Sequence, residues 1–88
     1  MILKRHKHYR KDALKAKLTD EQYAKRLKYL SRILEEKPLP DEARDHLLIG
    51  EYKGFREFHL GGDMLIIYKV LDGVLYLQRM GTHSQLFR

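Results

Sequence analysis

Four side chains in the second half of the sequence have the chemistry of an acid–base site: Glu57, His59, Arg79 and His83. An unperturbed imidazole has a pKa of about 6.5, so a histidine can give or accept a proton near neutral pH. A carboxylate and a guanidinium can orient such a histidine and stabilise nearby charge. The alternative is an ordinary cross-strand pair between Glu57 and Arg79, beside a histidine that does no chemistry. The fold that positions these residues decides between the two.

The second half of the sequence is predicted to form a three-stranded antiparallel meander. Three short, apolar-rich stretches follow one another at residues 55–60, 64–71 and 74–80, and their composition is typical of strands. The dipeptides Gly61-Gly62 and Asp72-Gly73 separate them. Both suit two-residue hairpin turns, because such turns need positive φ angles.

Two-residue turns determine which residues lie opposite one another in the meander. Counting outward from the two turns places Ile66 opposite both Glu57 and Arg79, with His59 in the neighbouring row. The acid, the imidazole and the guanidinium are therefore expected on one face of the sheet. His83 has the same parity if the last strand continues that far.

The first half is predicted to supply one strand and a helical hairpin that covers the other face. Ile2 and Leu3 can begin a short strand, and residues 9–17 have helical spacing. A capping box of Thr19 and Gln22 begins a second helix, which ends before Pro38. The apolar stripe of this helix consists of Tyr23, Leu27, Leu30, Ile33 and Leu34. Together these elements predict one α+β domain over residues 1–88, with a four-stranded sheet.

Composition excludes several classes of protein. The 88 residues include no cysteine, which excludes a disulfide scaffold, a thiol nucleophile and thiolate metal sites. A chain of this size buries only roughly 60% of its unfolded surface, so we expect no large enclosed cofactor site. No apolar run approaches the ~20 residues of a membrane span, and residues 1–6 do not begin a signal peptide. We therefore expect a cytoplasmic protein without a bound cofactor.

Positive charge is concentrated at the start of the chain. The net charge is +6, from 18 Lys and Arg against 12 Asp and Glu. Residues 1–37 contain 12 basic and 5 acidic side chains, and the remainder contains 6 and 7. A basic half favours a polyanionic partner, although lysines and arginines also simply solvate helix faces. The five histidines show no metal-binding spacing such as HExxH, so we expect no metal site.

An ordered set of motifs resembles the YafQ branch of the RelE/ParE toxin superfamily. These motifs are Asp45-His46, Gly50 with Tyr52-Lys53-Gly54-Phe55-Arg56, His59, Asp63, Leu65-Ile66-Ile67-Tyr68, and Gly81-Thr82-His83 through Leu86-Phe87. The resemblance implies a bacterial type II toxin, a ribosome-dependent and metal-independent endoribonuclease that cuts mRNA in the ribosomal A site. It also implies a cognate antitoxin that holds the toxin inactive.

The same resemblance implies a set of functional positions. The catalytic set is His46, His59, Asp63 and His83, and the substrate-binding set is Arg79, Phe87, Glu57 and Arg56. Cleavage by a ribose 2′-OH needs a base to take its proton, an acid for the departing 5′ oxygen and a cation beside the phosphate. We expect His46 or His59 as the base, His83 as the acid and Arg79 as the cation.

Two positions depart from this pattern, and two other functions remain open. Relatives often have tryptophan where this chain has Met64, and Gly61-Gly62 replaces a stiffer acidic or proline-containing turn. Asp63 matches the family motif, but it points away from His59 if the Gly61-Gly62 turn is strictly two residues long. The same superfamily includes toxins that poison DNA gyrase, and a basic domain of this size could also bind RNA without cutting it. Neither alternative needs a set of histidines with an aspartate, so the nuclease is favoured.

Overall fold

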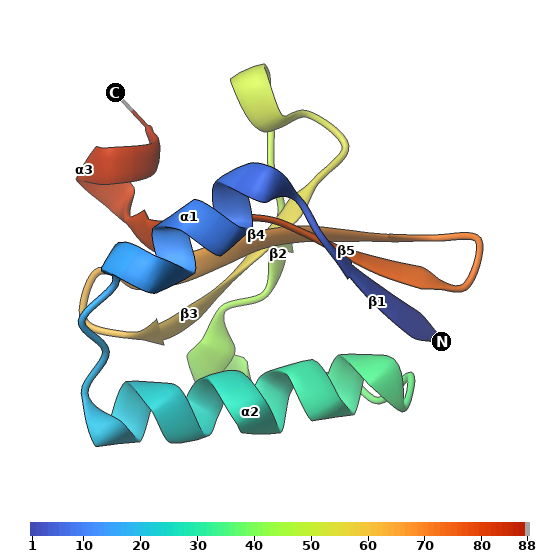
Figure 1. Cartoon of the computed structure of the whole chain (residues 1–88). Coiled ribbons are helices and arrows are strands. Elements are labelled where there is room, and N and C mark those ends of the chain that lie inside the picture. Colours follow the sequence, from blue (N-terminus) through green and yellow to red (C-terminus); the bar gives the residue numbers. More distant parts are fainter. Residues whose placement is uncertain (88) are drawn as a thin grey trace.

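The computed structural model, which describes residues 1–87, is built around a mixed five-stranded sheet in the order β1-β5-β4-β3-β2 (Figure 1). Its strands are β1 (Ile2–Arg5), β2 (His46–Leu47), β3 (Arg56–Gly61), β4 (Met64–Leu71) and β5 (Val74–Thr82). Its helices are α1 (Lys7–Lys15), α2 (Asp20–Leu34) and the short α3 (His83–Leu86), with 3-10 turns η1 (Asp41–Ala43) and η2 (Gly50–Tyr52).

The predicted α+β class is confirmed, and the sheet has one strand more than expected. β1 pairs in parallel with the first half of β5, and β3, β4 and β5 form the antiparallel meander. The additional strand, β2, consists of only two residues, which pair antiparallel with the start of β3. A two-residue strand is too short to show an alternation of apolar and polar side chains, so the sequence pattern does not predict it.

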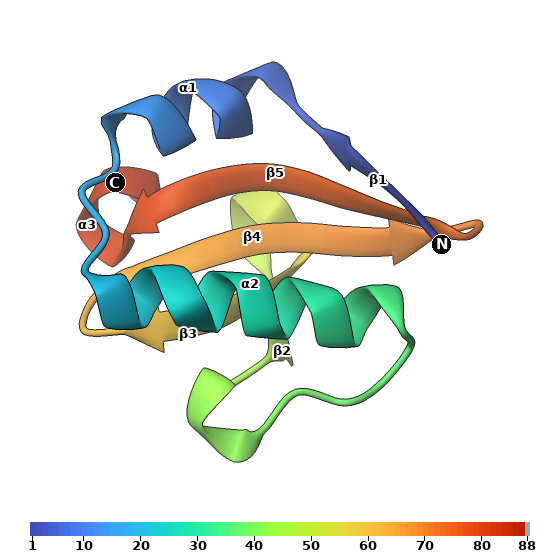
Figure 2. The same ribbon diagram turned by 60° about the horizontal axis from the view of Figure 1, so that its bottom comes forward.

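The two long helices pack against different strands rather than as a close hairpin. α1 lies against β5, whereas α2 lies across the sheet near β3 (Figure 2). The predicted capping box at Thr19 and Gln22 is present, with both of its hydrogen bonds. The predicted apolar stripe of α2 was partly wrong, since Tyr23 and Leu27 are about half exposed while Tyr29 is fully buried. No helix among residues 1–87 is long and apolar enough to cross a membrane.

Apolar side chains pack on both faces of the sheet. On the face toward α2, Tyr29 and Ile33 contact strand residues that include Phe58, Ile66 and Tyr68. On the other face a smaller cluster gathers the side chains of Leu48, Leu65, Ile67 and Leu86, with Tyr52, Phe55 and Phe87 packed around it. This second cluster forms the apolar floor beside which the candidate site residues lie.

The predicted register is shifted by one residue at two places. A bulge between His59 and Gly61 moves the first turn to Gly62-Asp63, and a second irregularity interrupts the pairing of β4 with β5 after Ile67. Ile67, rather than Ile66, therefore lies opposite both Glu57 and Arg79. Because the two shifts are equal, Glu57 and Arg79 still share one face, as predicted.

Alkaline pH is expected to weaken this fold through Tyr29. Burial raises the pKa of Tyr29 to about 12, and its 2.9 Å hydrogen bond to Glu42 adds to the rise. An unfolded tyrosine has a pKa of about 10, so the folded protein holds this proton more tightly. The resulting stabilisation is complete below about pH 10 and is lost as the pH rises toward about 12.

The Tyr29→Phe variant, which has no phenolic proton, is expected to lose less unfolding free energy over that pH range than the parent. Denaturant unfolding at about pH 9 and about pH 11 measures this difference. Tyr23→Phe, at a half-exposed position, is the matched control. Equal losses in the parent and both variants would show that Tyr29 carries no such effect.

Candidate active site

A buried carboxylate lies at the centre of the candidate site. Glu57 on β3 is only 4% exposed, and it sits opposite His46 on β2 and two residues before His59. Its Oε2 atom lies 2.8 Å from Nε2 of His59 and 3.3 Å from Nε2 of His46. Desolvation of a carboxylate is costly unless partners satisfy it, and these two imidazoles are its polar partners. We call Glu57, His46 and His59 the histidine–glutamate cluster.

The hydrogen bonds of His59 define its tautomer. An Nη2 atom of Arg44 lies 3.0 Å from Nδ1 of His59, and a guanidinium can only donate. Nδ1 must therefore be the unprotonated nitrogen, and the ring proton is on Nε2, where it is donated to Glu57. Both nitrogens of His59 are thus occupied, and its side chain is only 13% exposed.

His46 is held differently and is more accessible. Its Nδ1 lies 2.6 Å from the backbone carbonyl of Arg44, which can only accept, so Nδ1 carries a proton. Its Nε2 faces Glu57, and a hydrogen bond there requires a second proton on the ring. The side chain is 52% exposed. His46 is therefore open to solvent on one side while its Nε2 faces Glu57 on the other.

Arg44 positions both histidines, and its backbone conformation is unusual. It has φ 48° and ψ 44°, the left-handed region, which costs a residue with a Cβ atom roughly 1–2 kcal/mol. The next residue, Asp45, is fixed by Tyr68 Oη at 2.6 Å and Arg56 Nε at 3.1 Å. Burial, together with this bond to Asp45, raises the pKa of Tyr68.

Arg56 does not join the histidine–glutamate cluster. It lies opposite Tyr68 on the face of the sheet that α2 covers. Its guanidinium is paired with Asp45. Burial lowers the pKa of Arg56, but its contacts with Asp45 and Tyr68 outweigh this effect, so the pKa is raised overall. Arg56 therefore lies on the opposite face of the sheet from the cluster. Its ion pair holds Asp45, the residue directly before His46.

His83, the first residue of α3, and Phe87, which directly follows α3, lie together beyond the end of β5. Thr82 caps this helix by accepting from the Gln85 N–H, and the Gln85 side chain accepts from the Thr82 N–H. The imidazole of exposed His83 lies against the ring of Phe87, with centroids 4.7 Å apart. The His83 N–H donates to the carbonyl of Asp63 at 3.2 Å.

Asp63 lies in the β3–β4 turn itself, and glycine makes that turn possible. Gly61 and Gly62 have φ angles of 105° and 57°, which glycine adopts readily. The turn is displaced by one residue from the predicted Gly61-Gly62, so Asp63 belongs to no strand row. It adjoins His83 through the backbone hydrogen bond rather than facing His59.

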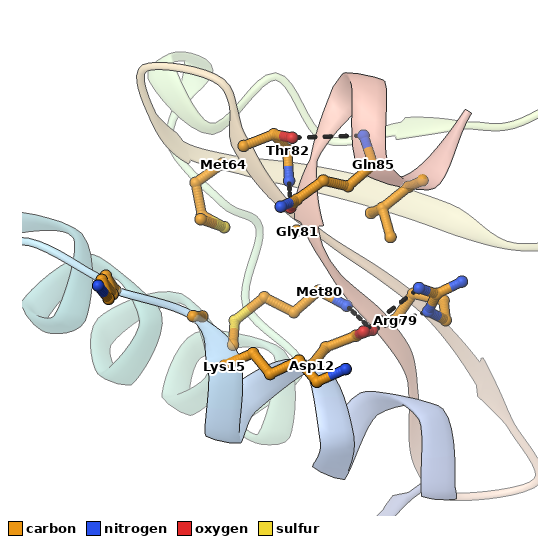
Figure 3. Close-up of a pocket in the computed structure, with 11 residues that line it drawn as sticks. Asp12, Lys15, Met64, Arg79, Met80, Gly81, Thr82 and Gln85 are labelled. Atoms are coloured by element: carbon orange, nitrogen blue, oxygen red, sulfur yellow. Dashed lines mark hydrogen bonds and ion pairs between the residues drawn. The ribbon is translucent and has the colours of Figure 1, made fainter. Parts of the chain in front are cut away.

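Arg79 shares a cross-strand row with Glu57, but its guanidinium turns toward α1. Its Nε and Nη2 atoms lie 2.7 Å and 3.2 Å from the two carboxylate oxygens of Asp12, and Nη1 lies 3.4 Å from Tyr52 Oη. The hydrogen bond to Asp12 raises the pKa of Arg79. Asp12 also accepts from the Met80 N–H at 3.0 Å, so it covers the outer edge of β5 (Figure 3).

The structure therefore brings five of the sequence-predicted residues into two groups on one face. His46, Glu57 and His59 form one group, and His83 and Phe87 form the other, with Leu65 and Ile67 on the strand between them. Asp63 adjoins the second group from the β3–β4 turn. Sequence reasoning missed Arg44 and Asp12. No motif identifies them, although Arg44 directly precedes the Asp45-His46 pair.

Three potential metal ligands converge in the histidine–glutamate cluster. One donor atom each from His46, Glu57 and His59 lies within 4.8 Å of the others, and imidazole and carboxylate groups are common ligands of zinc. A histidine that binds metal through Nε2 carries its proton on Nδ1, yet Nδ1 of His59 accepts from Arg44. The present arrangement is therefore a hydrogen-bonded cluster, and Arg44 would have to move before His59 could bind a metal through Nε2.

The sequence and the structure are both similar to those of known bacterial toxins. The family model of the bacterial toxin of type II toxin–antitoxin system, YafQ, matches residues 1–88. The mRNA interferase toxin YafQ of Escherichia coli K12 is 44% identical over 64 residues, which cover 70% of each chain. A copper-bound mutant toxin from Helicobacter pylori has a TM-score of 0.81 at 33% identity and covers 97% of both chains.

YafQ in the E. coli DinJ–YafQ complex has a TM-score of 0.78 at 34% identity, over 98% of this chain and 97% of that one. The family model thus spans the whole sequence, and the structural likeness extends over nearly all of it. The chain belongs to the YafQ family of bacterial type II toxin–antitoxin toxins.

Proposed function

We propose that this protein is a ribosome-dependent endoribonuclease that cuts mRNA in the A site by attack of a ribose 2′-OH on the adjacent phosphate. The observation that carries the proposal is the histidine–glutamate cluster, with His83 on the same face of the sheet. Members of the family are named mRNA interferases, and such cleavage needs an acid and a base at separate places. The two groups on this face supply titratable side chains at two such places.

Within this proposal His46 is the general base. Its Nε2 lies 3.3 Å from the carboxylate of Glu57, so the positive charge that His46 gains with the proton of the 2′-OH is stabilised by the negative charge of Glu57. Opposite charges a few ångströms apart attract more strongly in a partly buried site than in bulk water. His59 already donates to Glu57 and accepts from Arg44, so its role is to hold the carboxylate in place. His46, rather than His59, is therefore the residue proposed as the general base.

His83 is the general acid on the other side. It is exposed, and its contact with Phe87 orients the ring. It gives its proton to the departing 5′ oxygen, while Arg79 stabilises the charge on the phosphate. Among residues 1–87, Asp12 and Tyr52 are the hydrogen-bond partners of the Arg79 guanidinium, and they leave one N–H of Nη1 and one of Nη2 unused. Those two donors are available to phosphate oxygens.

No metal ion takes part in this proposed mechanism. The 2′-OH is an internal nucleophile, so a metal is not needed to generate hydroxide. A relative from H. pylori has been crystallised with copper bound, and one donor atom each of His46, Glu57 and His59 converges in this chain, so added copper or zinc tests this point. If copper or zinc binds the cluster, it occupies the base and is expected to inhibit cleavage.

Regulation by a cognate antitoxin is part of the same proposal. A related YafQ has been seen in a complex with DinJ, a toxin–antitoxin complex. Residues 1–37 of this chain carry 12 basic and 5 acidic side chains, and such a surface steers an acidic partner toward itself. The antitoxin would then neutralise the toxin either by covering the active face or by lying across this basic half.

Primer extension on mRNA in a translating extract tests the function directly. Addition of the protein is expected to produce codon-aligned cuts in translated mRNA, with a chelator that binds copper and zinc but leaves Mg²⁺ free present throughout. The same mRNA without ribosomes is expected to stay intact. Intact mRNA together with gyrase-dependent DNA breaks would support a gyrase poison instead, and bound but uncut mRNA would support a passive RNA-binding module.

A further inference from the structure

We propose that the groove between the C-terminal end of α1 and the β5–α3 junction is a second mRNA contact site, which holds the backbone of a nucleotide next to the scissile one. The inference rests on the proposed function, because it extends the path of the RNA beyond the reacting phosphate. It assigns a role to Lys15 and Lys17, which neither the histidine–glutamate cluster nor α3 uses.

The groove has the size of a site for one nucleotide. Its volume is about 470 Å³, within the range of about 300–1,000 Å³ that is usual for small-ligand sites. One wall is formed by α1 and the segment after it, with Lys15 and Lys17, and the other by the end of β5 and α3, with Gln85 and Leu86 (Figure 3). Met64 lines the groove from the start of β4.

The charge of the groove is positive despite the carboxylate of Asp12. That carboxylate is paired with Arg79 and with the Met80 N–H, so its charge is already neutralised. Lys15 and Lys17 are exposed, and neither forms an ion pair among residues 1–87. The C-terminal end of α1 contributes roughly half a negative charge, which the two lysines exceed. A phosphate group is the ligand that fits this excess.

The apolar part of the lining suits a ribose or base rather than a free anion. Met64 is partly buried in the main core, and Leu86 is 5% exposed. Gly81 keeps α3 close to β5, since a Cβ atom there would lie 2.9 Å from Gln85 Oε1 and 3.3 Å from Leu86 Cδ2. The groove is therefore bounded by packed elements and combines two cations with a small apolar surface.

The position of the groove favours RNA over an acidic peptide. Arg79 belongs both to the lining of the groove and to the row that contains Glu57. Thr82 lines the groove, and the next residue is His83. An RNA strand whose scissile phosphate contacts Arg79 and His83 therefore reaches Lys15 and Lys17 with a neighbouring phosphate. An acidic segment of the antitoxin would meet the same two lysines, and the binding measurements below distinguish the two ligands.

The test measures binding to ribosomes programmed with an mRNA that carries a 2′-O-methyl group at the cleaved nucleotide, so that binding is separated from cleavage. The variant is the pair Lys15→Gln and Lys17→Gln. The matched control is the pair Lys4→Gln and Lys28→Gln, which removes the same charge from exposed lysines outside the groove. Affinity is measured as a function of salt concentration.

The groove variant is expected to bind roughly 5- to 20-fold more weakly than the control pair at moderate salt. The slope of log affinity against log salt is expected to fall by about 0.7 to 1.4, which corresponds to one or two phosphates on a single strand at about 0.7 each. Replacing single phosphates beside the cleavage site by neutral methylphosphonates is expected to weaken the parent at one position or two. At those positions the methylphosphonate is not expected to weaken binding of the groove variant any further.

Three results would overturn the proposal. In the first, the groove variant binds like the control pair. In the second, methylphosphonates weaken the parent and the groove variant equally, which would show that the two lysines contact ribosomal RNA instead of mRNA. The variant could also lose affinity for the cognate antitoxin while its ribosome binding matches the control, which would make the groove a protein-docking site. A parallel assay with unmodified mRNA keeps the proposed function separate, because only failure of the parent and the control pair to cleave would contradict that function.

Discussion

Replacement of His83 by alanine is expected to slow mRNA cleavage by roughly 10²- to 10⁴-fold, the usual contribution of a general acid. The fold should be almost unaffected, because the His83 side chain is exposed and the helix cap is made by Thr82 and Gln85. The bond that ties this helix to the β3–β4 turn uses the backbone N–H of His83, which alanine retains. The expected loss is therefore in the chemical step.

A substrate with sulfur in place of the 5′ bridging oxygen separates this role from a structural one. A thiolate departs without needing a proton, so His83→Ala is expected to cut this substrate nearly as fast as the parent does. Single-turnover cleavage on programmed ribosomes, at saturating protein, gives both rates. Ser84→Ala, at the next exposed position of α3, is the control and should behave like the parent with both substrates.

Phe87→Ala should give a different pattern from His83→Ala. Phe87 packs against the smaller apolar cluster and against the His83 ring, so its loss loosens α3 and weakens engagement of the substrate. The sulfur substrate should not restore its activity. If His83→Ala cuts the ordinary substrate within about threefold of the parent rate, that deficit is too small for a lost general acid. The role would then belong to another residue.

The parts of the fold that were predicted from the sequence are those with local signals. The capping box at Thr19 and Gln22 depends on residues three apart, and the structure contains both of its hydrogen bonds. The Asp72-Gly73 turn was placed correctly, since Leu71 pairs with Val74. In both cases short-range chemistry decides the conformation, and tertiary packing does not compete with it.

Register was harder to predict, because a bulge has no sequence signature of its own. The bulge near Gly61 and the shift after Ile67 each displaced the pairing by one residue. One such shift alone would have moved Glu57 and Arg79 to opposite faces. The shared face was therefore predicted correctly although the rows were not.

Long-range partners were out of reach of sequence reasoning. Arg44 acts through a left-handed backbone conformation and through a contact with His59, fifteen positions away. Asp12 meets Arg79 across 67 positions. The buried face of α2 was misjudged for a related reason. Tyr29 is fully buried and its hydroxyl donates to Glu42. Periodicity alone placed Tyr23 and Leu27 on the buried stripe and left out Tyr29.

Replacement of Glu57 by glutamine is expected to lower the cleavage rate by roughly 10²-fold or more while the protein stays folded. The amide has the shape of the carboxylate, and its oxygen can still accept the Nε2 proton of His59, now 2.8 Å from Oε2. The lost feature is the negative charge beside Nε2 of His46. Without that charge, a proton abstracted from the 2′-OH gains no ion pair. In serine proteases, replacing the carboxylate that orients the base by an amide costs about 10⁴-fold.

Single-turnover cleavage by Glu57→Gln and His46→Ala, with both the ordinary and the 5′-sulfur substrates, tests this assignment. Because both changes affect removal of the 2′ proton, the sulfur leaving group should rescue neither variant, in contrast to His83→Ala. Glu51→Gln, at an exposed position in η2, removes the same charge and should cleave at the parent rate, and thermal melts establish that all variants are folded. Near-parent cleavage by Glu57→Gln would show that Glu57 serves only to hold the two imidazoles. Rescue by sulfur would place the cluster on the leaving-group side, and the base would then have to be sought near α3.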